Sequence, residues 1–562
     1  MNANLDPHLL SISPDAVRDA AQETADPYAT VENALPRLAA DPGAMYEDTV
    51  IAALKTIRQK DEAGYARLVA RATGCKTRLD KLTAPERDSH QDSNQDLILQ
   101  AAQAHCQFHH DADGRGVAVI EIDGHREVHL VDSQGFKKWL RAAVFKANRM
   151  GIPEQAMNTA IATLNAIGSH EGTEVKVHMR CAKVGDAYFI DLCDDAWRAI
   201  RVDKDGYTVL DRPPIYFIRT KGMRPLPEPV TAGDLDKLWD HLNIPEPCRK
   251  LVVTWLIDCF RPDTAHVVLE QTGEMGCAKS TGQRRKRDLV DPNEVALRSK
   301  PKTVEDIYIA ANNGYVVSYE NLSHLTAEQQ DAMCVISTGG GFSTRQLYTN
   351  GEEFVMKAHA PIMLNGINPV VSQPDLLDRT ISIELPTITA SNRQDDQSLE
   401  ASWQRDYPSI FTGLLDLFSR ALRMLPDVQI APDQQKRMLD FQRLGEAVCL
   451  ALGMEAGAFS KEMDIAQGHG VLRGLETYGV SNAIQVLLSG AKERKWEGTY
   501  LSLLGDLNQL PGIDRSNWPK SPKGLSAQLK RIAPGLRRIG ISVERLERDR
   551  HGSWIRIYSL SV

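Results

Sequence analysis

The stretch Gly273-Glu-Met-Gly-Cys-Ala-Lys279-Ser-Thr281 decides the fold of this chain. It follows an apolar run, His266-Val-Val-Leu-Glu270, and precedes a segment with the pattern of a helix. Backbone N–H groups in such a strand–loop–helix turn inward and cradle phosphates at the start of the helix. We therefore predict a nucleotide-binding P-loop made of Gly273, Glu274, Met275, Gly276, Cys277, Ala278, Lys279, Ser280 and Thr281.

Two loop residues have distinct expected roles. Lys279 would reach the β- and γ-phosphates of ATP, and the Ser280 hydroxyl would ligate Mg²⁺. Ala278 stands where a glycine usually precedes the lysine, and we expect it to adopt a helical conformation. Gly276 supplies the other flexible point. The alternative interpretation is an ordinary glycine-containing loop that only resembles the pattern.

Length and composition indicate a multidomain protein without a membrane partner. The 562 residues suffice for about three or four domains of ~150 residues. No apolar run reaches the roughly 18 residues of a membrane span, and the N-terminus lacks the features of a signal peptide. The nine cysteines are scattered without a Cys-x-x-Cys pair. We expect a cytoplasmic protein, and its net charge of −8 means that any nucleic-acid-binding surface must be local.

Changes in pattern along the chain predict five regions of an α/β multidomain fold. The alternation of strand and helix around the P-loop indicates a mainly parallel sheet covered by helices. The proline-rich stretch Met223–Pro229 marks the boundary before it. The expected regions are a helical N-terminal part with a linker (1–92), a mixed α+β domain (96–225), the ATPase core (230–395), a helical region (396–490) and a winged-helix-like module (491–562).

A second landmark is the apolar run Gly314-Tyr-Val-Val-Ser-Tyr, which ends in Glu320-Asn321. A buried strand that ends in an acid is how P-loop NTPases deliver the carboxylate that orients Mg²⁺. Glu320 would take this role, which leaves Asn321 in place of the usual base. An amide orients water but cannot accept its proton. The alternative is an edge-strand glutamate without a metal role.

Three further features follow in order. A hairpin is predicted from Thr338 to Lys357, with an Asn350-Gly351 turn. The strand after it ends in Asn365, an amide that can sense the γ-phosphate. Arg379 then precedes another strand, where an arginine can stabilise phosphate charge, often across a subunit boundary. Taken singly, the last two would be surface residues.

This ordered series resembles the core of superfamily 3 helicases, which are AAA+ ATPases of viral, phage and plasmid replication, including the primase-helicases. The stretch Gly273–Pro386 is more narrowly similar to ATP-binding proteins carried by bacterial mobile elements. The resemblance implies an AAA+ core, a sensor role for Asn365, an arginine finger at Arg379 and a DNA-facing hairpin. The catalytic set would be Lys279, Glu320, Asn321, Asn365 and Arg379, and the Mg²⁺ ligands Ser280 and Glu320.

DNA contacts are expected at two places. The hairpin carries Arg345, Tyr348 and Lys357, although its tip is acidic at Glu352 and Glu353. Nine Lys or Arg lie between Pro519 and Arg550, where two helices and a hairpin indicate a winged helix that contacts the DNA backbone. An intramolecular or protein-docking role is the alternative. The candidate DNA contacts of this module are Lys523, Lys530, Arg531, Arg537 and Arg538.

Two other clusters have less specific patterns. Arg284-Arg-Lys-Arg287 runs into the helix after the P-loop, and we expect a solvated face, with a DNA or subunit contact as the alternative. The segment His105–Asp113 contains metal-capable groups, but no second Cys/His pair follows at zinc spacing. A loop before a hairpin is the favoured interpretation over a metal or primase site.

The leading functional hypothesis is an ATP-dependent DNA helicase that acts on single-stranded or forked DNA. ATP would bind between the subunits of a ring, which we expect to be hexameric. The alternative is a nucleotide-gated switch or assembly protein in phage–host conflict that unwinds nothing. Asn321 and the acidic hairpin tip favour the alternative.

Overall fold

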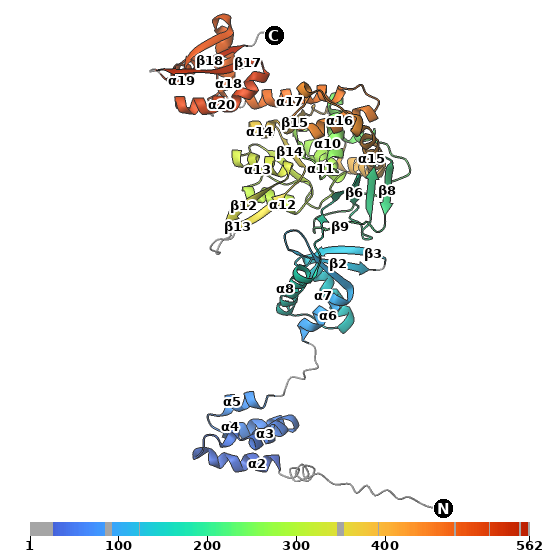
Figure 1. The fold of residues 1–562 in the computed structure, drawn as a ribbon, viewed down its shortest axis with the longest axis vertical. Helices are drawn as coiled ribbons and strands as arrows, with labels where there is room; N and C mark the ends of the chain where they lie inside the picture. The colour runs from blue at the N-terminus through green and yellow to red at the C-terminus, as the bar shows by residue number, and fades with distance from the viewer. Residues whose placement is uncertain are drawn as a thin grey trace, which may run out of the picture. The chain divides into compact units, whose positions relative to one another are not determined.

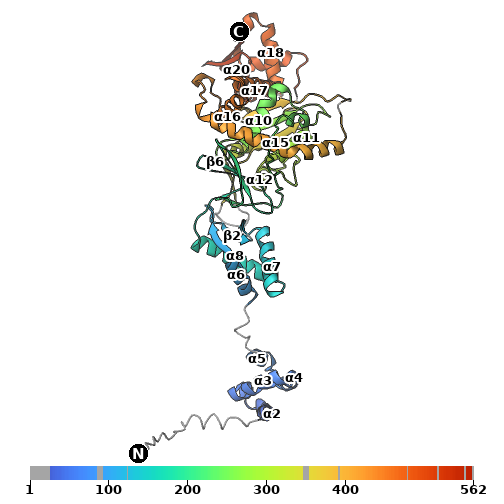
Figure 2. The same ribbon diagram turned by 90° about the vertical axis from the view of Figure 1, so that its right-hand side faces the viewer.

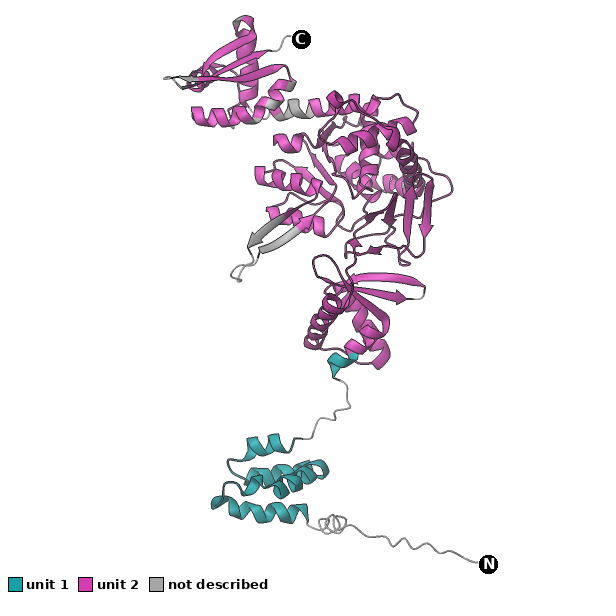
Figure 3. Ribbon diagram, in the orientation of Figure 1, with its two compact units in different colours: residues 1–97 teal, residues 98–562 magenta. Residues whose placement is uncertain are grey.

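The structure is a computed structural model, and the fold is shown as a ribbon in Figure 1. Packing divides the chain into two compact units, residues 1–97 and residues 98–562 (Figure 3). The described residues are 26–84, 93–122, 124–345, 353–389, 391, 393–476, 479–515, 518–549 and 552–559.

The first unit is a small bundle of helices, drawn in blue in Figure 1. Its described part confirms the predicted helical character. Apolar residues at helical spacing, Val50, Leu54 and Ile57, form much of its core. Most of the predicted linker lies outside the described residues. The helices are α2 (Pro27–Ala34), α3 (Asp48–Lys60), α4 (Glu62–Arg71) and α5 (Lys76–Leu82).

The second unit begins with an antiparallel sheet of order β1-β2-β3 and three helices (Figure 2). Alternation along β2 sends Ala118 and Ile120 into the core with the helices, and Val117 and Val119 to the other face. The hairpin expected after residue 113 is present as β2 and β3. The preceding segment, expected to be a loop, instead forms strand β1 over Cys106–His110. The elements are α6 (Asn94–His105), β1 (Cys106–His110), β2 (Gly116–Ile122), β3 (His125–Leu130), α7 (Gln134–Asn148) and α8 (Glu154–Glu171).

A second antiparallel sheet, β5 to β8, packs on the helices of the following region. Tyr188 and Ile200 share one apolar core with helices beyond residue 238. The buried Arg180 also forms an ion pair with Asp291, at 3.1 Å. The sheet before residue 223 and the helices after residue 229 therefore share one core, although the sequence predicts a domain boundary between them. The strands of this sheet are β5 (Cys181–Val184), β6 (Ala187–Asp191), β7 (Ala199–Asp203) and β8 (Gly206–Leu210). A separate parallel pair is formed by β4 (Val177–His178) and β9 (Tyr216–Phe217).

The centre of the second unit is a four-stranded sheet of order β11-β14-β10-β15. All three of its pairings are parallel, as the alternation of strand and helix predicts. Apolar side chains of two separate cores pack on its two faces. The strands also bury polar residues, among them Glu270 and Ser382. The strands are β10 (Val268–Thr272), β11 (Val317–Leu322), β14 (Ile362–Gly366) and β15 (Thr380–Glu384).

Helices cover both faces of this sheet. One face packs against α12 and α13, and the other belongs to the core formed by α10, α15, α16 and α17. Helices also make up most of the described chain between residues 396 and 490. In the part of the chain that the structure describes, no helix has the length and apolarity to cross a bilayer. The helices are α10 (Arg249–Asp258), α11 (Lys279–Asp288), α12 (Val304–Asn312), α13 (Ala327–Thr338), α14 (Pro374–Leu377), α15 (Asp396–Met424), α16 (Leu439–Ala451) and α17 (Ala458–Glu476).

The C-terminal module contains the predicted two helices and hairpin, preceded by one more helix and strand. Its core includes Val480 and Ile484, so the module begins near residue 479 rather than at 491. The sheet order is β16-β18-β17. The elements are α18 (Gly479–Gly490), β16 (Lys495–Thr499), α19 (Tyr500–Gln509), α20 (Pro522–Arg538), β17 (Ile541–Asp549) and β18 (Gly552–Ser559).

In the basic cluster of α11 only Arg284 is exposed, so the expected solvated face is wrong for the other three residues, and so is the alternative of a DNA or subunit contact. Arg285, Lys286 and Arg287 are buried at 4%, 1% and 0% exposure. Arg285 donates to the carbonyl of Leu399 at 3.0 Å, and Arg287 donates to the carbonyls of Val295 and Ala296 at 3.1 and 2.9 Å. Arg285 and Arg287 therefore hold α11 to neighbouring segments, and none of the three buried side chains is available to solvent or DNA.

Lys286 makes stability depend on pH. Its ammonium donates to the carbonyl of Gly282 at 2.7 Å, and burial lowers its pKa to about 7. Between about pH 10 and pH 7 the unfolded chain binds a proton that the folded chain does not, so stability falls as the pH falls through that window. Lys286→Met is expected to raise the free energy of unfolding by about 1–4 kcal/mol at pH 7.

Thermal unfolding at pH 7 and pH 9.5 tests this expectation. The gain for Lys286→Met should be smaller at pH 9.5, because less of the protonation penalty is present there. Lys300→Met is the matched control, since Lys300 is exposed. A gain that is equal at both pH values, or a loss at pH 7, would contradict the assignment.

Candidate functional site: the P-loop edge of the parallel sheet

The predicted P-loop lies at the carboxyl edge of the central sheet. β10 ends at Thr272, and α11 begins at Lys279. The loop is tied to its neighbours on both sides, because Leu385 N–H donates to the carbonyl of Thr272 at 2.8 Å and Gly273 N–H donates to that of Ile367 at 3.3 Å. The loop therefore starts from a fixed position between β14 and β15.

The backbone of the loop has three residues with positive φ. Gly273 has φ 150° and Gly276 has φ 81°, as their residue type allows. Ala278 has φ 60° and ψ 30°, which is left-handed. The expectation of a helical alanine is therefore wrong, because the chain must reverse its twist just before α11 begins. The usual glycine at this position would avoid the cost that a Cβ incurs there.

Gly273 also has a steric role. A Cβ at this position would lie 2.8 Å from the Cys277 sulfur and 2.9 Å from the Leu385 carbonyl oxygen. Any side chain would thus push the loop away from β15. Asn243, which the sequence analysis missed, adds a further tie, since its amide donates to the carbonyls of Cys277 at 3.1 Å and Pro386 at 2.6 Å.

The Lys279 side chain folds back over its own loop. Its ammonium donates to the carbonyls of Gly273 at 2.7 Å and Glu274 at 2.8 Å, and lies 3.5 Å from the Cys277 sulfur. To bind a phosphate, the Lys279 ammonium would only have to replace these two carbonyl acceptors by phosphate oxygens. The Lys279 geometry therefore fits an anion at this loop.

Glu320 and Asn321 lie at the carboxyl end of β11, where the ladder to β14 is irregular. Tyr319 pairs with Leu364, but the next pair is Leu322 with Gly366. Asn321 has φ 53°, a conformation that asparagine tolerates better than most residues. The bulge leaves Glu320 partly buried and Asn321 exposed at the same sheet edge as the P-loop. A strand-end carboxylate and a P-loop hydroxyl are oxygen ligands that suit Mg²⁺.

Asn365 joins the P-loop helix to the acidic strand. Its side-chain oxygen accepts from Asn321 N–H at 2.8 Å, and its amide nitrogen donates to the side-chain oxygen of Gln283 at 2.6 Å. Gln283 in turn donates to the Ser318 hydroxyl at 2.8 Å and the Tyr319 carbonyl at 3.0 Å. The sequence analysis missed Gln283, although its position one helical turn after Lys279 was a usable signal.

Arg379 lies at the opposite edge of the sheet. Its carbonyl accepts from Val268 N–H at 2.9 Å, at the start of β10. The five residues of β10 put about 15 Å between this point and the P-loop. The guanidinium is 15% exposed and lies 3.5 Å from Asp375. Arg379 therefore does not lie beside the P-loop of its own chain.

The predicted hairpin is present as β12 (Gly340–Arg345) and β13 (Glu353–Ala358), which pair antiparallel. It connects α13 to the amino end of β14, at the sheet edge opposite the P-loop. Lys357 is exposed and forms an ion pair with Asp113 at 3.1 Å. Tyr348 and the turn lie outside the described residues, and Arg345 is described for its backbone alone.

The basic face of the C-terminal module lies on α20. Leu525, Leu529, Ile532 and Leu536 are buried on one side of this helix. Lys523, Lys530 and Arg537 are exposed. Successive members of this exposed set are seven residues apart, which is about two helical turns, so all three lie along one side of the helix. The backbones of Arg531 and Arg538 belong to α20, but their side chains lie outside the described residues.

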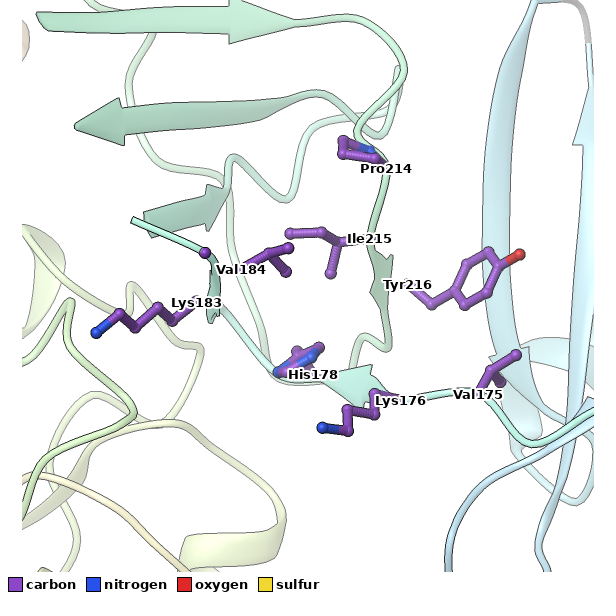
Figure 4. A pocket seen from close by; sticks show the side chains of 9 residues that line it. Val175, Lys176, His178, Lys183, Val184, Pro214, Ile215 and Tyr216 are labelled. Carbon is purple, nitrogen blue, oxygen red and sulfur yellow. The ribbon is translucent and has the colours of Figure 1, made fainter. Parts of the chain in front are cut away.

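A pocket of about 490 Å³ lies beside the β4–β9 pair, and none of its lining residues belongs to the predicted P-loop (Figure 4). Val184 and Ile215 form much of its apolar lining, and Lys183 forms an ion pair with Asp263 at 2.6 Å. In the metal-capable segment nearby, His109 stacks on Tyr216 and bonds to Thr173. Among the side chains that the structure describes, no group of three His, Cys, Asp or Glu is arranged to hold a metal ion.

The left-handed Ala278 generates a prediction about stability. Ala278→Gly removes the Cβ from a left-handed residue and is expected to stabilise the folded chain by about 1 kcal/mol. Ala311→Gly, in the regular helix α12, is the control and is expected to cost about 0.5–1 kcal/mol. Thermal unfolding of both variants measures the difference. Equal losses for the two variants would show that Ala278 is not strained.

Two protein-family models match the chain. Residues 235–464 match the model of the actinomycete integrative conjugative element replication protein, and residues 480–561 match the AICE RepA C-terminal domain. Together the two matches cover more than half of the chain. The second match begins where the structure starts the C-terminal module.

Solved structures give a weaker likeness, and no curated protein matches the chain. An apo A form of the NrS-1 C-terminal region aligns with a TM-score of 0.37 and 10% identity, over 83% of this chain and 98% of that chain. An apo structure of NrS-1 residues 305–718 aligns with a TM-score of 0.35 and 11% identity, over 84% and 100%. By the family matches, the chain belongs to the replication proteins of actinomycete integrative conjugative elements and is a replication protein of a mobile element.

Proposed function

We propose that this replication protein is an ATP-hydrolysing DNA helicase or translocase. The observation that carries the proposal is the arrangement at one sheet edge: a lysine folded over a P-loop, with Glu320 and Asn365 at the ends of the next two strands. Parallel strands bring their carboxyl ends to the same edge, so these groups converge where a nucleotide's phosphates would lie. The family supports the replication role.

The residues divide the proposed chemistry between them. Loop amides and Lys279 hold the phosphates, while Ser280 and Glu320 hold Mg²⁺, which neutralises charge on the transferred phosphoryl group. Asn365 accepts a hydrogen bond from the Asn321 backbone and so holds Asn321 in position to orient the attacking water. Neither amide accepts a proton. Hydrolysis is therefore expected to be slow unless another base takes part.

The position of Arg379 supports a proposal of self-association. If this arginine contacts a nucleotide, that nucleotide belongs to a neighbouring subunit, because the predicted P-loop of its own chain is at the other edge of the sheet. We therefore propose a ring, expected to be hexameric, in the cytoplasm. The 340–358 hairpin lies at the edge where Arg379 is found, and it and α20 are the proposed contacts to DNA.

A second candidate function is a nucleotide-gated switch that assembles on ATP without moving DNA. Asn321 favours it, because the place of the expected second acid is taken by an exposed amide in a strand bulge. The Lys357–Asp113 ion pair favours it too. Lys357 is one of two cationic residues in the 338–357 hairpin, and the ion pair competes with a DNA phosphate for it.

ATP turnover separates the two candidates. The wild-type chain is expected to hydrolyse ATP faster with single-stranded DNA, and Lys279→Ala to lower that rate about 100-fold or more, because it removes a charge that stabilises the transition state. Lys300→Ala, at an exposed site, is the control and should retain the rate. Turnover that ignores DNA, while ATP still drives assembly, would reject the helicase and support the switch.

The basic line of α20 gives a separate prediction. Replacing Lys523, Lys530 and Arg537 together by alanine should weaken duplex binding and lower the slope of log affinity against log salt by about 2–3, because each phosphate contact releases counterions. Anisotropy titrations at several salt concentrations measure this slope. The control replaces the exposed Lys55, Lys60 and Lys76 of the first unit. An unchanged slope in the α20 variant would remove this helix from the DNA interface.

A further inference from the structure

Arg393 lies over the P-loop of its own chain, and neither the motif series nor the family match assigns it a role. A Cβ built on Gly276 would be 3.5 Å from one terminal nitrogen of the Arg393 guanidinium. The side chain is exposed, so the contact is made from the solvent side of the loop. Gly276 is the second glycine of the loop, with φ 81°. The guanidinium thus lies near the part of the loop whose amides we expect to bind an anion.

The connection that carries Arg393 is fixed at both ends. At its start, Asn243 ties Pro386 to Cys277 of the P-loop. At its end, Asp395 caps α15 by accepting from Ser398 N–H at 2.9 Å. The first turn of α15 is in turn held to α11, because Arg285 donates to the Leu399 carbonyl at 3.0 Å. Arg393 therefore lies between two points, Pro386 and the start of α15, that hydrogen bonds tie to the loop and to α11.

Two cationic side chains lie close to the loop. Lys279 donates to two loop carbonyls and lies 3.5 Å from the Cys277 sulfur, and Arg393 lies near Gly276. Within the described ranges, no carboxylate forms an ion pair with Arg393 or Lys279. Two cations beside a loop that is expected to turn its amides inward, without an ion-paired acid, suit an oxyanion with several charges.

We propose that Arg393 binds the phosphates of the nucleotide in the P-loop of the same subunit. This inference rests on the proposed function and adds to it a cationic contact made in cis, distinct from Arg379. A guanidinium can bind two phosphate oxygens at once, which a lysine cannot. Because Arg393 is three residues before α15, the contact also connects the nucleotide directly to the long helix of the α15–α17 bundle.

Calorimetry of the full chain with Mg·ATPγS tests the proposal. Arg393→Ala should weaken binding about tenfold or more relative to wild type, the effect of losing a charged hydrogen bond. Arg393→Lys should recover part of the loss, since it keeps the charge without the fork. Arg284→Ala is the matched control, because it removes an exposed arginine from the P-loop helix itself. Its affinity should stay within about twofold of wild type.

The outcomes separate this inference from the function on which it rests. Wild-type protein that binds no Mg·ATPγS would overturn the proposed nucleotide site. Wild-type binding that Arg393→Ala leaves within twofold would overturn the Arg393 contact alone. An equal loss in Arg393→Ala and Arg284→Ala would also overturn it, because general loss of positive charge would then explain the effect. Unchanged thermal unfolding of the Arg393→Ala variant excludes misfolding as the cause.

Discussion

The pair of amides formed by Gln283 and Asn365 is the interaction on which the candidate site depends. Their 2.6 Å hydrogen bond joins the P-loop helix to the strand between the P-loop and the acid. Each amide also holds the acidic strand, Gln283 through Ser318 and Tyr319 and Asn365 through the Asn321 backbone. Removing either partner would leave buried polar groups unpaired, at about 1–3 kcal/mol each. Loop, acid and strand end are therefore held as one body.

Buried cations extend this rigidity to the flanking regions. Arg285 fastens the P-loop helix to α15, and Arg287 fastens it to residues 295–296. Asp291, just beyond the helix, also pairs with Arg180, which immediately precedes β5 of the second antiparallel sheet. A charge that is buried without partners is costly, so these contacts specify one arrangement of the elements.

Periodicity and turn chemistry predicted the local elements well. The apolar run before the P-loop, the run before Glu320, the hairpin and the C-terminal helix pair all form where their patterns indicate. Contacts between segments that are distant in the sequence were not predictable in this way. The burial of Arg285 and Arg287 depends on carbonyls far along the chain or beyond the helix end, which a local charge count does not reveal. The left-handed Ala278 and the approach of Arg393 to Gly276 likewise depend on how separate segments meet.

The central claim is that the loop from Gly273 to Thr281 binds the phosphates of a nucleotide through its amides and Lys279. Hydrogen exchange of the full chain, with and without Mg·ATPγS, tests this at the amides themselves. The account predicts slower exchange in peptides that cover residues 274–282, together with the peptide that contains Arg393. Exchange in both peptides that is unchanged at saturating nucleotide would contradict it.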